Sequence, residues 1–268
     1  MSGAGVVTII QARTGSTRLP GKVLLPLGGG TILSRMLERV RRSRLAGEII
    51  VATTTERADD PIATQARRLG FTVFRGHPTD LLDRHYRAAS AVGAAHVVKI
   101  PSDCPLIDPA IIDDVIGWYL SRADALDYAG NLHPATHPDG NDVEIMRFEA
   151  LERAWREAKE SHQREHTTPF LWEHPERFRI SNVAWPRGRD LSTTHRYVLD
   201  YAEDYEVIRE LDAALHRPGA CFGVEEIVAH LDRHPVLMSR NARFAGRSWY
   251  RDHLDKRRAA EAATAIGA

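Results

Sequence analysis

The stretch VVTIIQARTGSTRLPGK occupies residues 6–22 and changes character halfway along its length. Residues 6–10 form an apolar run rich in β-branched side chains, which is typical of a buried strand. The run breaks into small residues, two glycines, a proline and the three cations Arg13, Arg18 and Lys22. Backbone amides and cations in such a loop can hold a polyphosphate. The sequence therefore predicts an anion site at the end of this strand.

The loop departs from the P-loop of ATPases. Gly15 and Gly21 are separated by five residues rather than four. Lys22 is followed by Val23 instead of the serine or threonine that binds magnesium. Pro20 argues against a helix that starts before Gly21, because the residue ahead of a proline is pushed out of the α region. A nucleoside triphosphate can bind outside an ATPase cradle, and a purely structural turn is the alternative.

A second strand-like run, VVKI at residues 97–100, leads into the turn PSDCPLIDP at residues 101–109. Two prolines bracket Asp103 and stiffen the turn. Its carboxylate is therefore expected at the C-terminal end of a strand, where open α/β sheets bind their ligands. Asp103 and Asp108 can instead cap the turn and the next helix, and for Asp108 this interpretation is favoured.

Strand-like runs alternate with helical patterns in the first half of the chain. The patterns predict strands at 6–11, 48–54, 71–75 and 96–100, and helices near 31–43, 60–69, 82–91 and 110–121. This rhythm predicts an α/β fold with a doubly wound, mostly parallel, Rossmann-like sheet that helices cover on both faces. The rhythm changes beyond residue 127, where strands are expected at 141–148 and 178–185 and helices at 149–159 and 168–173.

The composition is that of an ordinary globular chain. It has 268 residues, of which 43% are hydrophobic and 27% charged, and one domain with a sizeable core is expected. Lys plus Arg equals Asp plus Glu at 36 each, so no net charge attracts nucleic acid or an anionic membrane, and a small substrate is expected. The two cysteines give neither a disulfide framework nor a zinc pattern, and no stretch matches a signal peptide or a membrane span. A cytoplasmic location is therefore expected.

Several motifs in a fixed order resemble one family. They lie between about residues 6 and 211 and read QARTGSTRLPGK, IVATTTERADDPI, FRGHPTDLLDRHY, SDCPLIDP, PDGNDVEI, REHTTPFLW and LDYAEDYEVIREL. Together they resemble cytidylyltransferases of the spore-coat polysaccharide type, relatives of the CMP-sugar-acid synthetases that activate acylneuraminate and 3-deoxy-manno-octulosonate. The resemblance implies a glycosyltransferase-A-like nucleotidyltransferase domain at residues 1–235. It also implies an insert at about 128–190 for acceptor and homodimer contacts, and residues 236–268 are expected as a helical extension or tail.

The activity that this resemblance implies is Mg²⁺-dependent transfer of CMP from CTP to an acceptor with release of pyrophosphate. Such chemistry needs cations on the phosphates and carboxylates for the metal. The expected catalytic residues are Arg13, Lys22, Asp103 and Asp200, and the two aspartates are the expected metal ligands. Asp200 is expected at the end of a short strand, in a motif where relatives carry Thr or Glu and then Pro instead of Tyr201 and Ala202. Capping of the next helix is the alternative for Asp200.

The expected nucleotide contacts extend beyond the first loop. In relatives the region of Arg75 and Arg84 lies under the cytosine, although exposed arginines are usually only solvated. The full expected set is Gln11, Ala12, Arg13, Gly15, Ser16, Arg18, Lys22, Thr54, Arg75, Arg84 and Ser102.

Four polar residues of the insert are candidates for the acceptor: Asp142, Glu144, Arg164 and His166. Asp142 and Glu144 alternate with apolar residues, so both carboxylates should face one side of a strand, to bind acceptor hydroxyls or an amine or to pair with arginines. His166 could deprotonate the acceptor or cap a helix. Sugar acids, sugar phosphates and phosphonates all present a suitable nucleophilic oxygen, and the sequence does not rank them.

Two other functions compete with this prediction. His162, Glu165 and His166 match the inverted zinc-peptidase pattern, which needs a continuous helix, whereas Ser161 and residues 167–169 suggest a break. The tail beyond residue 239 mixes arginines with Trp249 and Tyr250, as RNA-binding segments do, although the solvated face of a terminal helix is the favoured interpretation.

Overall fold

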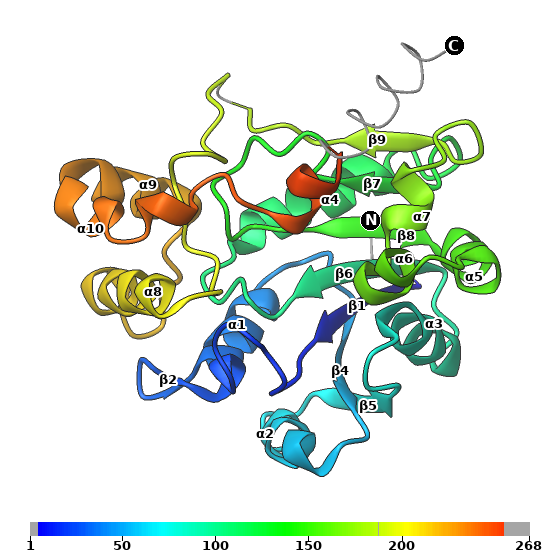
Figure 1. Cartoon of the computed structure of the whole chain (residues 1–268), viewed down its shortest axis with the longest axis horizontal. Coiled ribbons are helices and arrows are strands. Elements are labelled where there is room, and N and C mark those ends of the chain that lie inside the picture. The colour runs from blue at the N-terminus through cyan, green and yellow to red at the C-terminus, as the bar shows by residue number, and fades with distance from the viewer. Residues whose placement is uncertain (1–4, 187, 255–268) are drawn as a thin grey trace, which may run out of the picture.

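A seven-stranded sheet runs through the computed structural model, which describes residues 5–186 and 188–254 (Figure 1). Across the sheet the strands are ordered β5 (Thr72–Gly76), β4 (Glu48–Thr54), β1 (Val6–Gln11), β6 (His96–Pro101), β8 (Glu144–Arg147), β7 (Tyr128–Gly130) and β9 (Ile180–Asn182). β1 pairs in parallel with both β4 and β6, and β4 pairs in parallel with β5. β8 runs antiparallel to β6 and β7, whereas β7 and β9 are parallel. The expected doubly wound, mostly parallel sheet is confirmed.

Helices cover both faces of this sheet. α1 (Ile32–Val40), α2 (Asp60–Arg68) and α4 (Pro109–Leu120) pack on one face, and α3 (Leu81–Ala91) and α5 (Phe148–Glu157) pack on the other. Figure 1 shows α1 and α3 on opposite sides of β1. Successive strand residues point to opposite faces, so Val6 and Ile10 pack in one core cluster and Val7 and Ile9 in the other. Burial on both faces explains the continuous apolar run at the start of the chain.

A third core cluster joins the C-terminal helices α8 (Ala202–Leu215), α9 (Val224–Arg233) and α10 (Pro235–Ser239) to Tyr197 and Leu199. Residues 197–199 lie beside the loop that follows β6, where Leu199 N donates to Asp103 O at 2.7 Å. The expected strand ending at Asp200 is wrong, because this segment makes single hydrogen bonds to loops and joins no ladder. The packing nevertheless brings Asp200 beside the loop that follows β6.

The remaining elements are short. They are α6 (Ser161–His166), α7 (Pro169–Trp172), the hairpin of β2 (Pro26–Leu27) and β3 (Gly30–Thr31), and the 3-10 helices η1 (Lys22–Leu24), η2 (Arg57–Asp59) and η3 (Ala242–Phe244). The expected strand at 141–148 is reduced to β8, because residue 148 already begins α5, and the strand at 178–185 is reduced to β9. The sequence patterns missed β7, which is only three residues long. No helix in the described part of the chain is long and apolar enough to span a membrane.

Candidate active site

The loop at residues 11–22 is anchored by a buried carboxylate. Asp59, at the end of η2, accepts hydrogen bonds from the backbone N and the Oγ1 of Thr14, both at 2.7 Å. Its second oxygen accepts from Thr54 Oγ1. Gly21, with a φ of 70°, donates to Thr14 O at 2.9 Å and closes the loop in a left-handed conformation that favours glycine. Sequence reasoning missed Asp59, because Asp59 is 45 residues from Thr14 and no local pattern links the two residues.

This loop forms one wall of a cavity of about 350 Å³, which we call the first cavity. The register of the sheet explains the position, because Gln11 at the end of β1 lies opposite Pro101 at the end of β6. Nine of the expected nucleotide residues line this cavity together with both aspartates. The nine are Gln11, Ala12, Arg13, Gly15, Ser16, Arg18, Lys22, Arg84 and Ser102.

Thr54 and Arg75, which were also expected to contact the nucleotide, do not line the first cavity. The hydroxyl of Thr54 is buried and donates to Asp59. Arg75 donates to Thr54 O at 2.8 Å and pairs with Asp60 at 2.6 Å. Both residues therefore contact the segment at residues 54–60, and their expected role as nucleotide contacts stays a prediction.

Lys22 lies between the two aspartates. Its Nζ is 3.0 Å from Asp200 Oδ1 and 3.4 Å from Asp103 Oδ2, and it donates to Leu199 O at 2.5 Å. Burial alone would lower the pKa of Lys22, but the two carboxylates raise it above its usual value. Arg18 also pairs with Asp200, at 2.7 Å. Burial opposes the ionised form of Asp200, but Lys22 and Arg18 hold its pKa below the usual value. The first cavity therefore contains charged cations and an ionised carboxylate at neutral pH.

Arg84 provides a further cation in the first cavity. Its side chain is 1% exposed, and it donates to the carbonyls of His77 and Pro78 at 3.1 Å. Burial and the nearby Arg13 lower the pKa of Arg84 to about 10. Two mutually repelling guanidinium groups favour an anion between them.

A second cavity, of about 500 Å³, adjoins the first. Residues common to both cavities are Gln11, Arg18, Pro101, Asp103, His166 and Asp200. The second cavity continues between the sheet, α7 and the segment 247–252, with Trp172, Trp249 and Tyr250 on its walls. The two aspartates expected to bind metal therefore lie where the cavities meet.

Asp142 and Glu144 both line the second cavity, but their environments differ. Glu144 pairs with Lys99 and accepts from Tyr128 OH at 2.7 Å. Burial opposes its charge, yet Lys99 keeps the pKa of Glu144 below its usual value. Within the described chain no group donates a hydrogen bond to the Asp142 carboxylate, and burial and Asp139 raise its pKa well above the usual value. Asp142 is therefore the carboxylate available to a ligand.

Arg164 and His166 were also expected to contact the acceptor. Arg164 does not line either cavity and donates to Asp80 at 2.8 Å and to Trp155 O at 2.7 Å, so its expected acceptor contact stays a prediction. His166 lines both cavities and stacks on Trp249 with centroids 3.8 Å apart. Burial and the nearby Lys99 lower the pKa of His166 to about 4, so its imidazole is neutral at pH 7 and a weak base.

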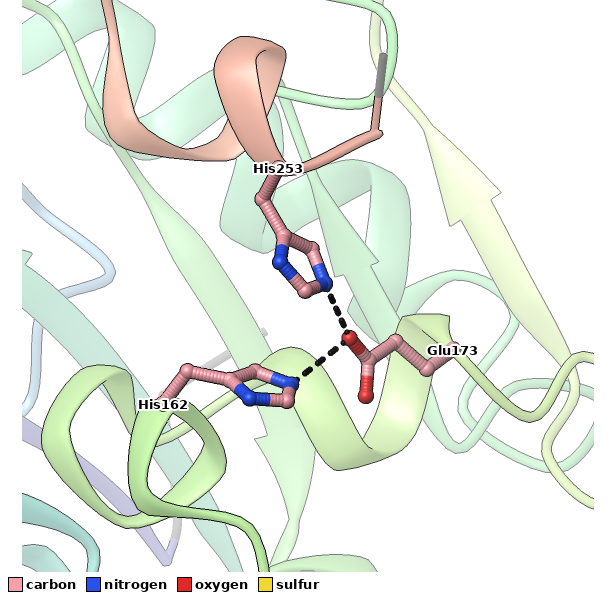
Figure 2. Close-up of side chains that lie close together, drawn as sticks. All are labelled: His162, Glu173 and His253. Atoms are coloured by element: carbon pink, nitrogen blue, oxygen red, sulfur yellow. Dashed lines mark hydrogen bonds and ion pairs between the residues drawn. The ribbon is translucent and has the colours of Figure 1, made fainter. Parts of the chain in front are cut away.

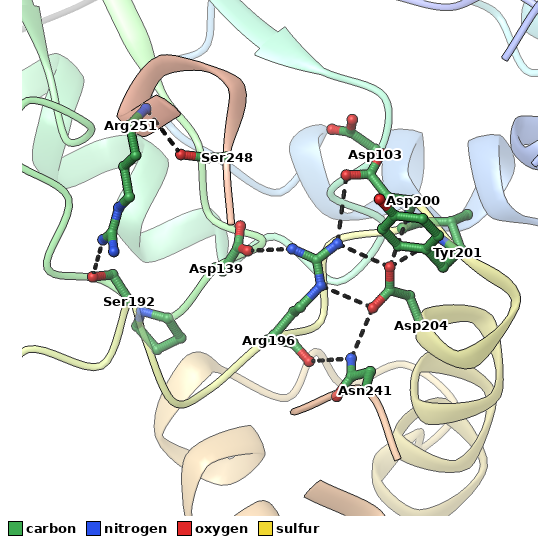
Figure 3. Close-up of polar contacts among 12 residues, drawn as sticks. Asp103, Asp139, Ser192, Arg196, Asp200, Tyr201, Asp204, Asn241, Ser248 and Arg251 are labelled. Carbon is green, nitrogen blue, oxygen red and sulfur yellow. Dashed lines mark hydrogen bonds and ion pairs between the residues drawn. The ribbon is translucent and has the colours of Figure 1, made fainter. Parts of the chain in front are cut away.

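A buried arginine holds Asp200 in place (Figure 3). Arg196 makes two hydrogen bonds of 2.9 Å to Asp204, one of 2.7 Å to Asp139 and one of 3.4 Å to Asp200. Asn241 donates to Asp204 at 2.8 Å. Burial outweighs Arg196 and, with nearby carboxylates, raises the pKa of Asp139 to about 7. Sequence reasoning missed this network. Its only signal in the sequence was that Arg196 comes shortly before Asp204, which lies in the first turn of α8.

The structure does not show the arrangement that either a zinc peptidase or an RNA-binding tail would need within the described residues. α6 begins at Ser161 and ends at His166, so the expected breaks lie at its two ends. The pattern itself is helical, but His162 bonds to Glu173 at 2.9 Å while Glu165 lines the first cavity. Trp249 and Tyr250 pack against the second core cluster and line the second cavity instead of forming an exposed nucleic-acid platform. The basic residues of the tail at 256–258 lie outside the described residues.

Known proteins resemble this chain in sequence and in fold. The chain matches the family described as Cytidylyltransferase over residues 7–227. It is 32% identical to the spore coat polysaccharide biosynthesis protein SpsF of Bacillus subtilis, over 86% of this chain and 95% of that protein. A cytidylyltransferase structure from Leptospira borgpetersenii has a TM-score of 0.82 and 32% identity, covering 91% of this chain and 98% of that one. A CMP:2-keto-3-deoxy-manno-octonic acid synthetase complexed with CTP shares the fold, with a TM-score of 0.58 and 19% identity over 78% of this chain and 98% of that one.

Proposed function

This chain belongs to the cytidylyltransferase family and is a CTP-dependent nucleotidyltransferase, and from that premise we propose that it transfers CMP from CTP to a small acidic acceptor, with release of pyrophosphate. The observation that carries the proposal is that the two cavities meet at Asp103 and Asp200. A triphosphate in the first cavity and an acceptor in the second would approach each other beside the same two carboxylates.

The residues of the first cavity suit the triphosphate. Arg13, Arg18, Lys22 and Arg84 supply positive charge around one cavity whose backbone loop is already anchored. The acceptor oxygen must attack the α-phosphorus in line with the leaving pyrophosphate, so the protein needs to orient the phosphates and stabilise the charge that develops. We assign Lys22 and Arg18 to the leaving pyrophosphate, because Arg18 lines both cavities and Lys22 contacts the two aspartates at their junction.

The donor set at this junction fits magnesium. Asp103 and Asp200 both contact the ammonium group of Lys22, so the two carboxylates reach one cation at the same time. Magnesium prefers oxygen ligands and usually takes one or two carboxylates together with substrate phosphates. We propose that Asp103 and Asp200 hold Mg²⁺, which would add positive charge beside the reacting phosphate.

The second cavity suits a hydroxylated acid. Asp142 offers a carboxyl group that receives no hydrogen bond from the described chain, and its carbonyl oxygen can accept a hydrogen bond from an acceptor hydroxyl. Arg247 lines the same cavity and offers a guanidinium to an acidic group. The aromatic walls of Trp172 and Tyr250 can pack against the apolar face of a sugar. These features favour a sugar acid over a neutral sugar as acceptor.

The test is pyrophosphate release from CTP and Mg²⁺ over a panel of sugar acids, sugar phosphates and phosphonates. We expect turnover with at least one acidic acceptor, a preference for CTP over the other nucleoside triphosphates, and no turnover after chelation. The Asp142→Asn variant should raise KM for the acceptor and leave KM for CTP unchanged. Turnover with none of the acceptors, or equal use of all four nucleotides, would contradict the proposal.

We also propose that the protein is a homodimer that uses the insert. Trp118 and Ile180 are 40% and 38% exposed, and Trp118 Nε1 donates to Ser181 Oγ at 3.0 Å beside the edge strand β9. A large apolar pair at a sheet edge is a common element of an interface. Sedimentation should give a dimer that Ile180→Asp dissociates, and a monomeric wild type would contradict this assignment.

A further inference from the structure

Two histidines and a glutamate meet outside both cavities (Figure 2). His162 lies on α6, Glu173 follows α7, and His253 lies near the end of the described chain. The Nε2 atoms of His162 and His253 lie 2.9 and 2.7 Å from the same carboxylate oxygen, Glu173 Oε1. The three candidate ligand atoms all lie within 4.8 Å of one another. Three segments far apart in the chain thus converge on one point with metal-ligating atoms.

We propose that His162, Glu173 and His253 form a zinc site that fastens the C-terminal segment, residues 248–254, onto α6 and α7. Two imidazole nitrogens and one carboxylate oxygen are a ligand set that Zn²⁺ accepts, with a fourth position open to water. Tetrahedral ligands of zinc lie about 3.3 Å from one another at usual bond lengths. The present N to O distances would have to open by roughly 0.5 Å, a shift that side-chain rotation can supply.

The surroundings orient these ligands. Gln163 Nε2 donates to Glu173 Oε2 at 2.8 Å, which leaves Oε1 directed at the two histidines. The indole of Trp249 stacks on His253 with centroids 4.9 Å apart and on His162 at 5.9 Å. Partners of this kind fix the orientation of metal ligands and raise affinity. Zinc would take the place of the Nε2 hydrogens, so a neutral imidazole would carry its one proton on Nδ1, and a doubly protonated imidazole would release one proton to solvent.

This site differs from the peptidase pattern in residues and in role. The peptidase pattern needs His166 as a ligand and Glu165 as a base, whereas both of these residues line the first cavity. Trp249 and Tyr250, which precede His253, line the second cavity. Zinc at this position would therefore fix one wall of that cavity and leave the phosphate site alone.

The experiment uses the full chain, stripped with a chelator and checked for fold by circular dichroism. Titration with Zn²⁺ in excess Mg²⁺ should show one equivalent bound with micromolar or tighter affinity, roughly as a three-ligand site requires. Zinc should also raise the melting temperature and slow proteolysis of the chain beyond residue 247. Glu173→Gln and His253→Gln should each abolish stoichiometric binding, and Gln163→Leu should weaken it roughly 10- to 100-fold.

Two further variants separate this site from adventitious binding. His230 and the exposed His234 form a stacked pair with centroids 4.0 Å apart, so His230→Gln tests for zinc held by any neighbouring histidines. His166→Ala tests the peptidase pattern. We expect both variants to bind zinc as the wild type does. Absence of binding, binding that survives His253→Gln and Glu173→Gln, or loss of binding in either control would overturn the proposal.

Discussion

At the scale of single residues, Lys22 connects the two halves of the candidate active site. It belongs to the 11–22 loop, yet its ammonium group contacts Asp103 and Asp200, which arrive from β6 and from the segment before α8. Its neighbour Arg18 contacts only Asp200 of that pair. The two cations should therefore contribute differently to binding and to turnover.

Replacement of these cations should separate kcat from KM. Lys22→Ala should lower kcat about 100-fold, because a cation over the leaving pyrophosphate matters most as charge develops. Arg18→Lys retains the charge but loses the forked geometry, and should raise KM for CTP about tenfold. Steady-state kinetics with varied CTP measure both, with the exposed Lys159→Ala as control. Wild-type constants in both variants would mean that this loop is only a turn.

The two carboxylates should be far less tolerant of change. Asp103→Asn and Asp200→Asn should each lower kcat by two or more orders of magnitude, roughly as loss of a metal ligand does, with little change in fold. Higher Mg²⁺ should restore part of the activity. Asp232→Asn is the matched control, because Asp232 is an exposed carboxylate that contacts the buried His195 and lines neither cavity. Near-normal turnover of Asp103→Asn would contradict the assignment of the metal ligands.

At the scale of elements, η2 determines the shape of the 11–22 loop. Asp59 accepts two hydrogen bonds from Thr14 and one from Thr54, and the side chains of Asp59 and Thr54 are buried. A buried carboxylate that loses donors costs about 1–3 kcal/mol. The loop therefore depends on an element 45 residues away in sequence.

Asp59→Asn should destabilise the protein by about 1–3 kcal/mol and also raise KM for CTP, because the amide cannot accept all three hydrogen bonds. Asp113→Asn is the control, since Asp113 accepts from Ser43, Arg44 and Leu45 far from both cavities. The Asp113→Asn variant should be less stable than the wild type but have an unchanged KM for CTP. Urea unfolding and kinetics measure the two effects. If Asp59→Asn leaves KM unchanged, the loop does not need this anchor.

At the scale of the whole molecule, burial keeps several histidines neutral. Burial lowers the pKa of His85 to about 3, and those of His133 and His137 to about 4. The unfolded chain binds a proton at each of these residues below about pH 6.5, whereas the folded chain does not. Their contribution to stability is therefore complete above pH 6.5 and is lost progressively as the pH falls toward the folded pKa.

Acidification from pH 7 to pH 5 should thus lower the free energy of unfolding, by about 2 kcal/mol for His85 alone. His85→Gln should reduce the slope of the free energy of unfolding against pH by an amount that corresponds to about one proton. The exposed His234→Gln is the control and should leave the slope unchanged. Urea midpoints measured between pH 5 and pH 7 test this, and an unchanged slope in His85→Gln would contradict it.

The sequence by itself determined the sheet, its covering helices and the loop at residues 11–22 that we propose to bind phosphate. Apolar periodicity reports which faces of a strand or helix are buried, so β1, β4, β5 and β6 were predicted to within a residue or so. The helices on both faces follow from the same signal. The motifs also pointed to Lys22 and Asp103, because their place at strand ends follows from local order in the chain.

Only the tertiary structure decided which charges meet. Arg75 and Arg164 have the same local appearance as Arg84, yet they pair with Asp60 and Asp80, and Arg84 alone of the three lines the first cavity. The anchor Asp59 and the brace Arg196 were invisible for the same reason. Pairing across the fold depends on sheet register and on how helices pack, and neither leaves a periodic trace in the sequence. The sequence therefore identified single residues of the candidate site, whereas the long-range hydrogen bonds that hold them together are visible only in the tertiary structure.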